Sequence, residues 1–224
     1  MNSIAAKTLT FKRITSENLE NAENQVINDP LYGTEGVAIE KIFKDYAKNT
    51  DVHIVMMKIC LLDFTNGTNI NKHRKKISLY EIAKKITEIK NIDRRIEKGD
   101  PSVVNEIAKC VHKETKQELV NLFSFASKFC HYHNRYGYGK DDYSIFDSVV
   151  QAVLPVYFDD ITHSQIENWR KDYQYEKFNQ FIGDKLGDLK IPIEGKRFKL
   201  DHFLWYPNKD KMPIRKKDIV VWED

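Results

Sequence analysis

Two stretches decide how the chain is interpreted: Phe123-Ser-Phe-Ala-Ser-Lys-Phe-Cys-His-Tyr-His-Asn134 and, after a loop rich in tyrosine and glycine, Tyr143-Ser-Ile-Phe-Asp-Ser-Val-Val150. The first continues the apolar pattern that precedes it, which predicts a helix. The second places one carboxylate, Asp147, directly before a new amphipathic run. First-turn amides and the helix dipole stabilise a negative charge at a helix start. The simplest interpretation of Asp147 is therefore an N-cap.

The composition indicates a globular, mostly helical protein. A chain of 224 residues can bury a substantial core as one domain or as two lobes that share a groove. Charged residues make up 31% and aromatic residues 12%, and both signs of charge are mixed along the chain. The net charge of +3 permits nucleic-acid binding without requiring it.

The lack of recognisable targeting signals favours a cytoplasmic protein. The N-terminus lacks the apolar core of a signal peptide, and no apolar run approaches the about 18 residues that span a bilayer. We therefore expect no membrane contact. We also expect a monomer.

No cofactor or metal is expected from the sequence. Cys60, Cys110 and Cys130 are odd in number and widely spaced, which favours small buried hydrophobic residues over disulfides or ligands. His131 and His133 lie two residues apart, so a helix would direct them to different faces, and no acid or thiol completes a ligand set.

The chain divides into an N-terminal arm, residues 1–33, and a helical domain, residues 34–224. Helix starts are predicted after Asp51 and at the capping-box sequences that begin at Ser78 and Thr162. Residues 52–64 are apolar on nearly every face, which predicts a central helix surrounded by others.

An amide-rich loop and a cationic run follow that helix. Asn66, Thr68 and Asn69 are followed by Lys72, Arg74, Lys75 and Lys76. Amides hydrogen-bond base edges and lysines or arginines neutralise phosphates, so the segment suits a surface that contacts duplex DNA. On residues alone, a solvated charged loop is an equal interpretation.

The sequence Ser144-Ile-Phe-Asp-Ser-Val-Val resembles the segment that carries the catalytic aspartate in the helix-hairpin-helix DNA glycosylase superfamily. In lyase-competent members a lysine precedes it on the helix that leads into the loop, and Leu122-Phe-Ser-Phe-Ala-Ser-Lys128 occupies that frame. The resemblance covers roughly residues 50 to 160, with Ser124 and Ala126 at the positions of the hairpin glycines. It implies a mainly α, two-lobed bundle with a groove, in which residues 34–76 and 160–224 form one lobe and residues 77–159 the other.

The resemblance also implies an activity and a partner. The protein would flip a modified base out of double-stranded DNA and cleave its N-glycosidic bond, with Asp147 stabilising positive charge on the sugar and Lys128 in support or as a nucleophile. The expected base pocket consists of Phe125, Tyr132, His133 and Tyr143. The expected DNA contacts are Ser124 and Ser127, the loop residues Asn66, Thr68 and Asn69, which would fill the space left by the flipped nucleotide, and the run Lys72, Arg74, Lys75 and Lys76.

Compact glycosylases of this kind resemble antiphage enzymes that remove glucosylated hydroxymethylcytosine from viral DNA, and we expect that role. Two alternatives stay open. One is a housekeeping repair glycosylase for damaged purines. The other is a non-catalytic DNA-binding module on a glycosylase-like scaffold.

Overall fold

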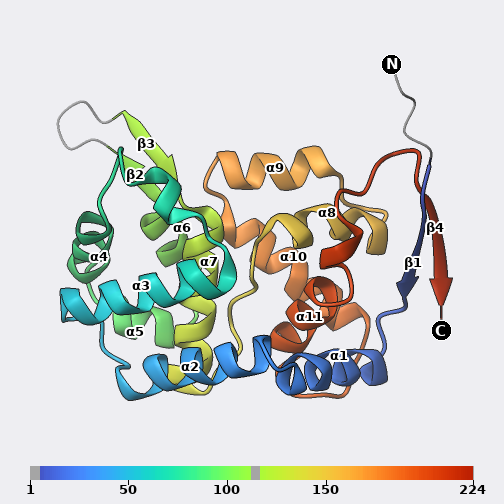
Figure 1. Cartoon of the computed structure of the whole chain (residues 1–224), viewed down its shortest axis with the longest axis horizontal. Coiled ribbons are helices and arrows are strands. Elements are labelled where there is room, and N and C mark those ends of the chain that lie inside the picture. Colours follow the sequence, from blue (N-terminus) through green and yellow to red (C-terminus); the bar gives the residue numbers. More distant parts are fainter. Residues whose placement is uncertain (1–5, 112–116, 224) are drawn as a thin grey trace.

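The computed structural model describes residues 6–111 and 117–223. This part of the chain is mainly helical, as the sequence predicts, and contains two small two-stranded sheets (Figure 1). Helices α1 to α11 span, in order, Ser16–Asn28, Tyr32–Asp45, Val52–Asn66, Leu79–Glu88, Ile92–Glu97, Ser102–Ala108, Phe123–Tyr132, Ser148–Tyr157, His163–Lys171, Tyr175–Asp188 and Lys196–Trp205. Strands β1 to β4 span Thr8–Lys12, Lys109–Val111, Glu118–Asn121 and Ile219–Glu223. Single turns of 3-10 helix lie at Ile70–His73 and Lys209–Lys211, and a π-helical turn at His133–Gly137 extends α7.

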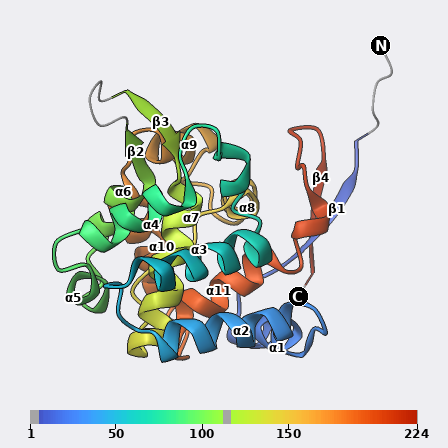
Figure 2. The ribbon, with the colours of Figure 1, turned by 60° about the vertical axis from the view of Figure 1, so that its left-hand side comes forward.

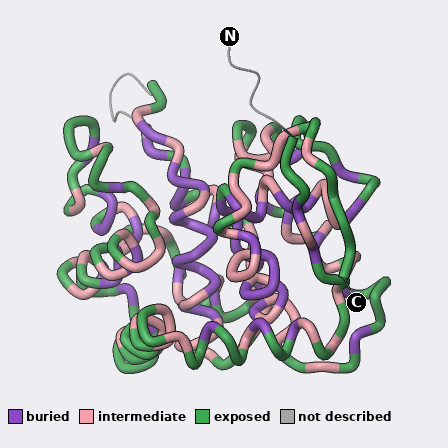
Figure 3. Tube along the Cα trace, turned by 45° about the vertical axis from the view of Figure 1, so that its right-hand side comes forward, coloured by how far each residue is buried: buried purple, intermediate pink, exposed green. Residues whose placement is uncertain are grey.

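Helix α7 lies at the centre of the molecule. It packs against α2, α3 and α6, and all of its residues from Phe125 to His131 are buried. Figure 3 shows the buried residues gathered toward the middle of the molecule and the exposed residues toward its outside. The segment that decided the sequence interpretation is therefore the core helix.

A second group of helices packs around α11, which contacts α1, α8 and α10. Helix α6 also contacts α10 and so joins the two groups. The division expected from the sequence placed residues 34–76 with residues 160–224. In the structure α3 packs most closely against α4 and also against α2 and α7, because its buried residues face those helices.

Local helix-start signals hold as predicted. Asp51 caps α3, and Ser78 and Thr162 form complete capping boxes at α4 and α9. Asp147 caps α8. These signals succeed because each depends on contacts within one turn of the chain.

Helix α3 differs from the expected central helix because one of its faces is open to solvent. Met57 is 52% exposed and Phe64 is 86% exposed. Cys60, expected to be buried, is exposed on the same helix, whereas Cys110 and Cys130 are buried as predicted. Lys58, in contrast, is fully buried and donates to the side-chain oxygen of Asn49 at 3.0 Å.

Within the N-terminal arm, the described residues 6–33 form β1 and α1. Strand β1 pairs in parallel with β4, so the first and last described strands lie side by side at one edge of the molecule (Figure 2). Helix α1 packs on α11 through Leu19, Ala22 and Val26. At the turn between α1 and α2, a Cβ on Gly33 would come within 2.1 Å of the carbonyl oxygen of Ile27, so only glycine fits.

Two further features were not predicted. Residues 109–111 and 118–121 form the antiparallel pair β2 and β3, which is too short to show alternating polarity. Helix α10 continues through Gly183 and Gly187, because its buried residues Phe178, Ile182 and Leu186 hold it on the core. Among the described helices, none has the length and apolar character needed to cross a membrane.

Candidate active site

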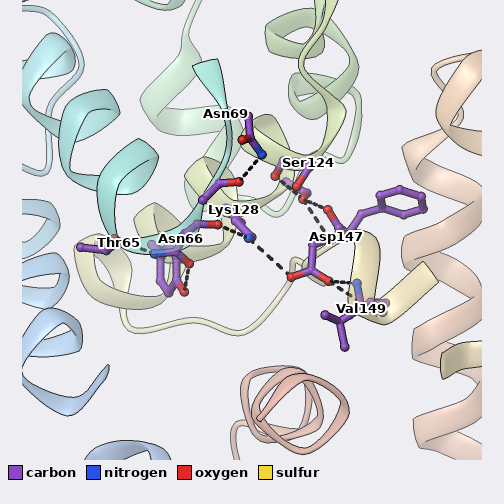
Figure 4. A network of polar contacts seen from close by, with 12 residues as sticks. Thr65, Asn66, Asn69, Ser124, Lys128, Asp147 and Val149 are labelled. Carbon is purple, nitrogen blue, oxygen red and sulfur yellow. Dashed lines mark hydrogen bonds and ion pairs between the residues drawn. The ribbon is translucent and has the colours of Figure 1, made fainter. Parts of the chain in front are cut away.

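Asp147 and Lys128 meet at the junction of α7 and α8 (Figure 4). One carboxylate oxygen of Asp147, Oδ1, accepts hydrogen bonds from the backbone amides of Val149 and Val150, both at 2.9 Å. The other oxygen, Oδ2, lies 3.5 Å from the Nζ of Lys128. Both residues are buried, with 8% and 6% exposure. Asp147 is thus an N-cap and an ion-pair partner at once.

Ser127 holds α7 close to the segment that leads into α8. Its hydroxyl accepts from the backbone amide of Phe146 at 3.0 Å and lies 3.3 Å from that residue's carbonyl oxygen. Ser127 and Phe146 are separated by 19 residues, the same separation as Lys128 and Asp147, so this contact holds the following pair in register. Ser127 was expected to contact DNA, but it is fully buried. Ser124 is partly exposed.

The loop after α3 completes the surroundings of the lysine. The Nζ of Lys128 donates to the backbone carbonyl of Asn66 at 3.0 Å, and the hydroxyl of Tyr132 donates to the Asn66 side-chain oxygen at 2.9 Å. That carbonyl belongs to the C-terminal end of α3, where the helix dipole favours a cation. Lys128 is therefore held between the negative end of one helix and the acidic cap of another.

This loop is folded around Asp63. Its Oδ1 accepts from the hydroxyl of Thr68 and from the amide of Ile70, both at 2.7 Å. The Asn69 side chain donates to the carbonyl of Gly67. The polar atoms of Asn66 and Thr68 therefore have partners within the protein, whereas the residues of the following cationic run, Lys72, Arg74, Lys75 and Lys76, are all exposed.

Lys128 and Asp147 line a cavity with a volume of about 560 Å³. Its walls come from α1, α2, α3, α7 and α11 and from the N-terminal end of α8. Pockets for small molecules range over about 300–1,000 Å³. The cavity therefore has room for a nucleobase that carries a further substituent.

Of the four expected base-pocket residues, Tyr132 lines the cavity and the other three do not. Phe125 is a core residue that packs on Phe129. His133 is fully buried and contacts the Ala47 carbonyl at 2.8 Å and the Asn49 amide at 3.1 Å. Tyr143 is fully buried and donates to the Asp100 carbonyl. Phe125 faces the core because it lies on the buried side of α7, whereas the π-helical turn directs His133 and the following loop directs Tyr143 into the core.

The sequence interpretation missed the contribution of α11. Phe198, Asp201, His202 and Trp205 of this helix line the cavity, as does Tyr136, which stacks on Tyr132. The signal in the sequence was three polar residues, Lys199, Asp201 and His202, inside the apolar run 198–205. It was indistinguishable from an ordinary amphipathic helix without the tertiary packing.

Two buried polar atoms of α11 have no hydrogen-bond partner among the described residues: Asp201 Oδ1 and His202 Nδ1. Burial and the negative charge of Asp147 raise the pKa of Asp201 to about 8, although Lys128 opposes this. Burial lowers the pKa of His202 to about 3, so its ring is neutral at pH 7. Unpartnered buried polar atoms cost free energy unless a ligand or water satisfies them. Both residues are therefore suited to hydrogen-bond a molecule in the cavity.

In the described part of the chain, no group of three or more His, Cys, Asp or Glu side chains is placed to hold a metal ion. What the cavity offers is a carboxylate, an amine, two unpartnered polar atoms and aromatic walls.

Comparison with known proteins gives a family match without an activity. The family model HI_0787_N, described as an N-terminal domain, matches residues 11–137. An uncharacterized protein of Haemophilus influenzae (strain ATCC 51907 / DSM 11121 / KW20 / Rd) is 29% identical over 172 residues, which cover 75% of this chain and 73% of that protein. No solved structure matches the chain significantly. The segment matched by the model includes Asn66, Lys128 and Tyr132, and it ends before Asp147 and Asp201.

Proposed function

The chain belongs to the HI_0787_N family, and from its cavity we propose that it is a DNA glycosylase that removes a modified base and leaves an abasic site. One observation carries the proposal. The spacing and sequence surroundings of Lys128 and Asp147 resemble those of the lysine and aspartate of helix-hairpin-helix glycosylases. In the structure the two residues form a buried ion pair on the wall of a cavity large enough for a flipped base. The mainly helical fold is compatible with the two-lobed arrangement of that superfamily.

Asp147 is suited to stabilise the transition state. When the C1′–N bond breaks, its electron pair leaves with the base and positive charge develops on the sugar. The Asp147 carboxylate is held in place by two backbone amides on Oδ1, which leaves Oδ2 directed at Lys128 and the cavity. A fixed charge of this kind stabilises an oxocarbenium-like state, and the carboxylate accepts a proton from the water that adds to C1′.

The contacts of Lys128 favour hydrolysis over lyase chemistry. A lysine that attacks C1′ must present a free electron pair on Nζ. Here Nζ donates to the Asn66 carbonyl and pairs with Asp147, which are contacts of the ammonium form. We assign Lys128 to the support of Asp147 and expect an intact abasic site as the product.

The size and polarity of the cavity support a substituted base as the substrate. Glu23, Glu35 and Glu40 line it together with the ring of Trp205. Carboxylates accept hydrogen bonds from hydroxyl groups, and an aromatic face packs on a sugar ring. A cytosine that carries a sugar, as in phage DNA, suits these walls, and we propose antiphage defence as the biological role.

The test is base excision from DNA of defined modification. Purified protein is incubated with genomic DNA from phages that carry unmodified cytosine, hydroxymethylcytosine or glucosylated hydroxymethylcytosine, and the DNA is then treated with hot alkali. We expect strand breaks in the glucosylated DNA. Breaks in oxidised or alkylated DNA alone would indicate a housekeeping repair enzyme. DNA binding without breaks on any substrate would replace the proposal with a non-catalytic module.

A further inference from the structure

A second cavity lies at the opposite end of α8 from Asp147. It has a volume of about 440 Å³ and is enclosed by the last turn of α8, the first residue of α9 and the strap that leads into β4. Its lining residues are Pro155, Val156, His163, Ile214, Arg215, Lys216, Asp218, Val220 and Trp222. This cavity shares no lining residue with the candidate active site.

The polar groups of this cavity favour an anion. Arg215 and Lys216 supply two cations, and the Nη1 of Arg215 is buried without a hydrogen-bond partner among the described residues. The opposing carboxylate, Asp218, accepts hydrogen bonds from the backbone amides of Lys7 and Arg215 at 3.1 and 2.8 Å. These amides, the Lys7 amide first, lower the pKa of Asp218, and the charge of Arg215 adds to this effect. The buried Nη1 of Arg215 is left without a partner among the described residues and can bind an anion.

The apolar wall of the cavity favours an aromatic ring next to that anion. Trp222 is 38% exposed, and its ring packs on Tyr157 and Phe11, with centroids 5.4 and 6.1 Å away. The Trp222 ring is therefore held in place by these two aromatic side chains and is partly exposed to solvent. A rigid indole beside a guanidinium matches a nucleotide, because every base stacks on an aromatic face and Arg binds phosphate oxygens.

We propose that this cavity binds one nucleotide of the DNA strand, with its phosphate at Arg215 and Lys216 and its base or sugar against Trp222. The inference rests on the proposed function, since it takes DNA as the substrate. The rise of about 1.5 Å per residue places Pro155 roughly 12 Å from Asp147 along α8. At about 3.4 Å of axis per nucleotide, this separation corresponds to about three or four nucleotides from the flipped base.

The experiment measures binding by fluorescence anisotropy with two kinds of duplex. Both contain a tetrahydrofuran abasic site, either with long flanks or with one flank cut to two base pairs. We expect shortening of one particular flank to weaken binding of the wild-type protein. Arg215→Gln and Lys216→Gln each lower the salt slope by about one unit on the long duplex, and the double variant no longer distinguishes the two duplexes. Excision at saturating DNA stays at the wild-type rate, because neither residue lies in the active-site cavity.

Arg94→Gln provides the matched control, since it removes the same charge from exposed α5 at the far side of the molecule (Figure 1). Arg215→Lys keeps the charge and should retain most of the affinity, which separates a weakened phosphate interaction from misfolding. If the Arg215 and Lys216 variants behave like Arg94→Gln, or lose affinity equally on both duplexes, the nucleotide site is refuted while the glycosylase proposal stands.

If the wild-type protein binds no duplex, the proposed function fails and a second arm decides the site. The dinucleotide pTpT is titrated against the protein with tryptophan fluorescence as the readout. Binding that is lost in Arg215→Gln supports a nucleotide site independent of glycosylase activity. Absence of binding overturns the site as well.

Discussion

The two ends of α8 are built for different tasks. At its N-terminal end, Asp147 is buried, accepts hydrogen bonds from two backbone amides and pairs with Lys128 on the wall of a cavity. At its C-terminal end, the half-buried Arg215, the exposed Lys216 and a partly exposed tryptophan surround a cavity, and one nitrogen of the Arg215 guanidinium has no partner among the described residues. Electrostatic effects are strong where water is excluded and are screened by salt where it is not. We therefore assign chemistry to the closed end and affinity to the open end.

The largest effect is expected from Asp147→Asn at the closed end. Asparagine caps helices as well as aspartate does, so α8 should persist. The amide carries no charge, and we expect excision to fall on the order of a hundredfold or more. DNA affinity should stay near the wild-type value. Single-turnover excision kinetics and anisotropy measure the two quantities separately.

Asp51→Asn is the matched control for that change. Asp51 caps α3 through the amides of His53 and Ile54 and lies outside the cavity, so the same substitution tests the cap without the chemistry. Equal loss of excision in both variants would trace the effect to folding. Full activity of Asp147→Asn would remove Asp147 from the mechanism.

Lys128→Gln should give the next largest effect. It removes the charge that faces Asp147 and a charge-assisted hydrogen bond, whose contribution of about 1.5–3 kcal/mol corresponds to a loss of roughly tenfold or more. Borohydride added during turnover of the wild-type protein should trap no covalent adduct with DNA. A trapped adduct that disappears in Lys128→Gln would establish a Schiff base and a lyase route.

Lys58→Gln controls for the loss of a buried lysine. Lys58 is fully buried and contacts Asn49, and it does not line the active-site cavity. The thermal midpoint should fall in both variants, while excision in Lys58→Gln should stay near the wild-type rate when measured well below that midpoint.

What the sequence predicted well depends on neighbouring residues. The caps at Asp51, Ser78 and Thr162 were found because a cap and its amides lie within one turn. The meeting of Lys128 and Asp147 came from a resemblance, and the buried contact between Ser127 and Phe146 supplies its physical reason. No local pattern in Ser127 distinguishes such a contact from an exposed serine.

What the sequence could not predict depends on packing between distant elements. His133 was expected in the base pocket, but the connection from α2 to α3 supplies its two partners and holds it in the core. Asp201 was overlooked because its importance comes from the proximity of Asp147 and Lys128, which are far away in sequence. Asp63 gathers the loop that carries Asn66, and a single aspartate before a turn carries no mark of that role.

An effect of intermediate size, on DNA affinity, is expected from the cationic run. Like the cavity at the C-terminal end of α8, this run presents cations to solvent. Neutralising Lys72, Arg74, Lys75 and Lys76 to Gln should lower the salt slope of DNA binding by about one unit for each phosphate that is no longer neutralised. Excision at saturating DNA should be unchanged. Lys98→Gln, an exposed lysine at the end of α5, is the control. A slope equal to that of the control would define the run as a solvated surface without a role in binding.

The smallest effect concerns the pH dependence of stability and tests whether the closed end excludes water. The pKa of Asp201 is raised from 3.8 to about 8, mainly by burial. Between these values the unfolded chain has lost the proton and the folded protein retains it. The unfolding free energy should therefore decrease as pH rises through this window and should level off above it.

Asp201→Asn should flatten this part of the profile, because asparagine does not titrate. The thermal midpoint of the variant relative to the wild type should rise from the acid side of the window to the alkaline side, since each free-energy change of about 1 kcal/mol shifts the midpoint by about 2–4 °C in a chain of this size. Asp188→Asn, an exposed site at the end of α10, should show no such trend. Parallel profiles for the wild type and Asp201→Asn would mean that water reaches the Asp201 carboxylate in the folded protein. The walls around Asp147 would then not be closed, and the contrast between the two ends of α8 would rest on charge alone.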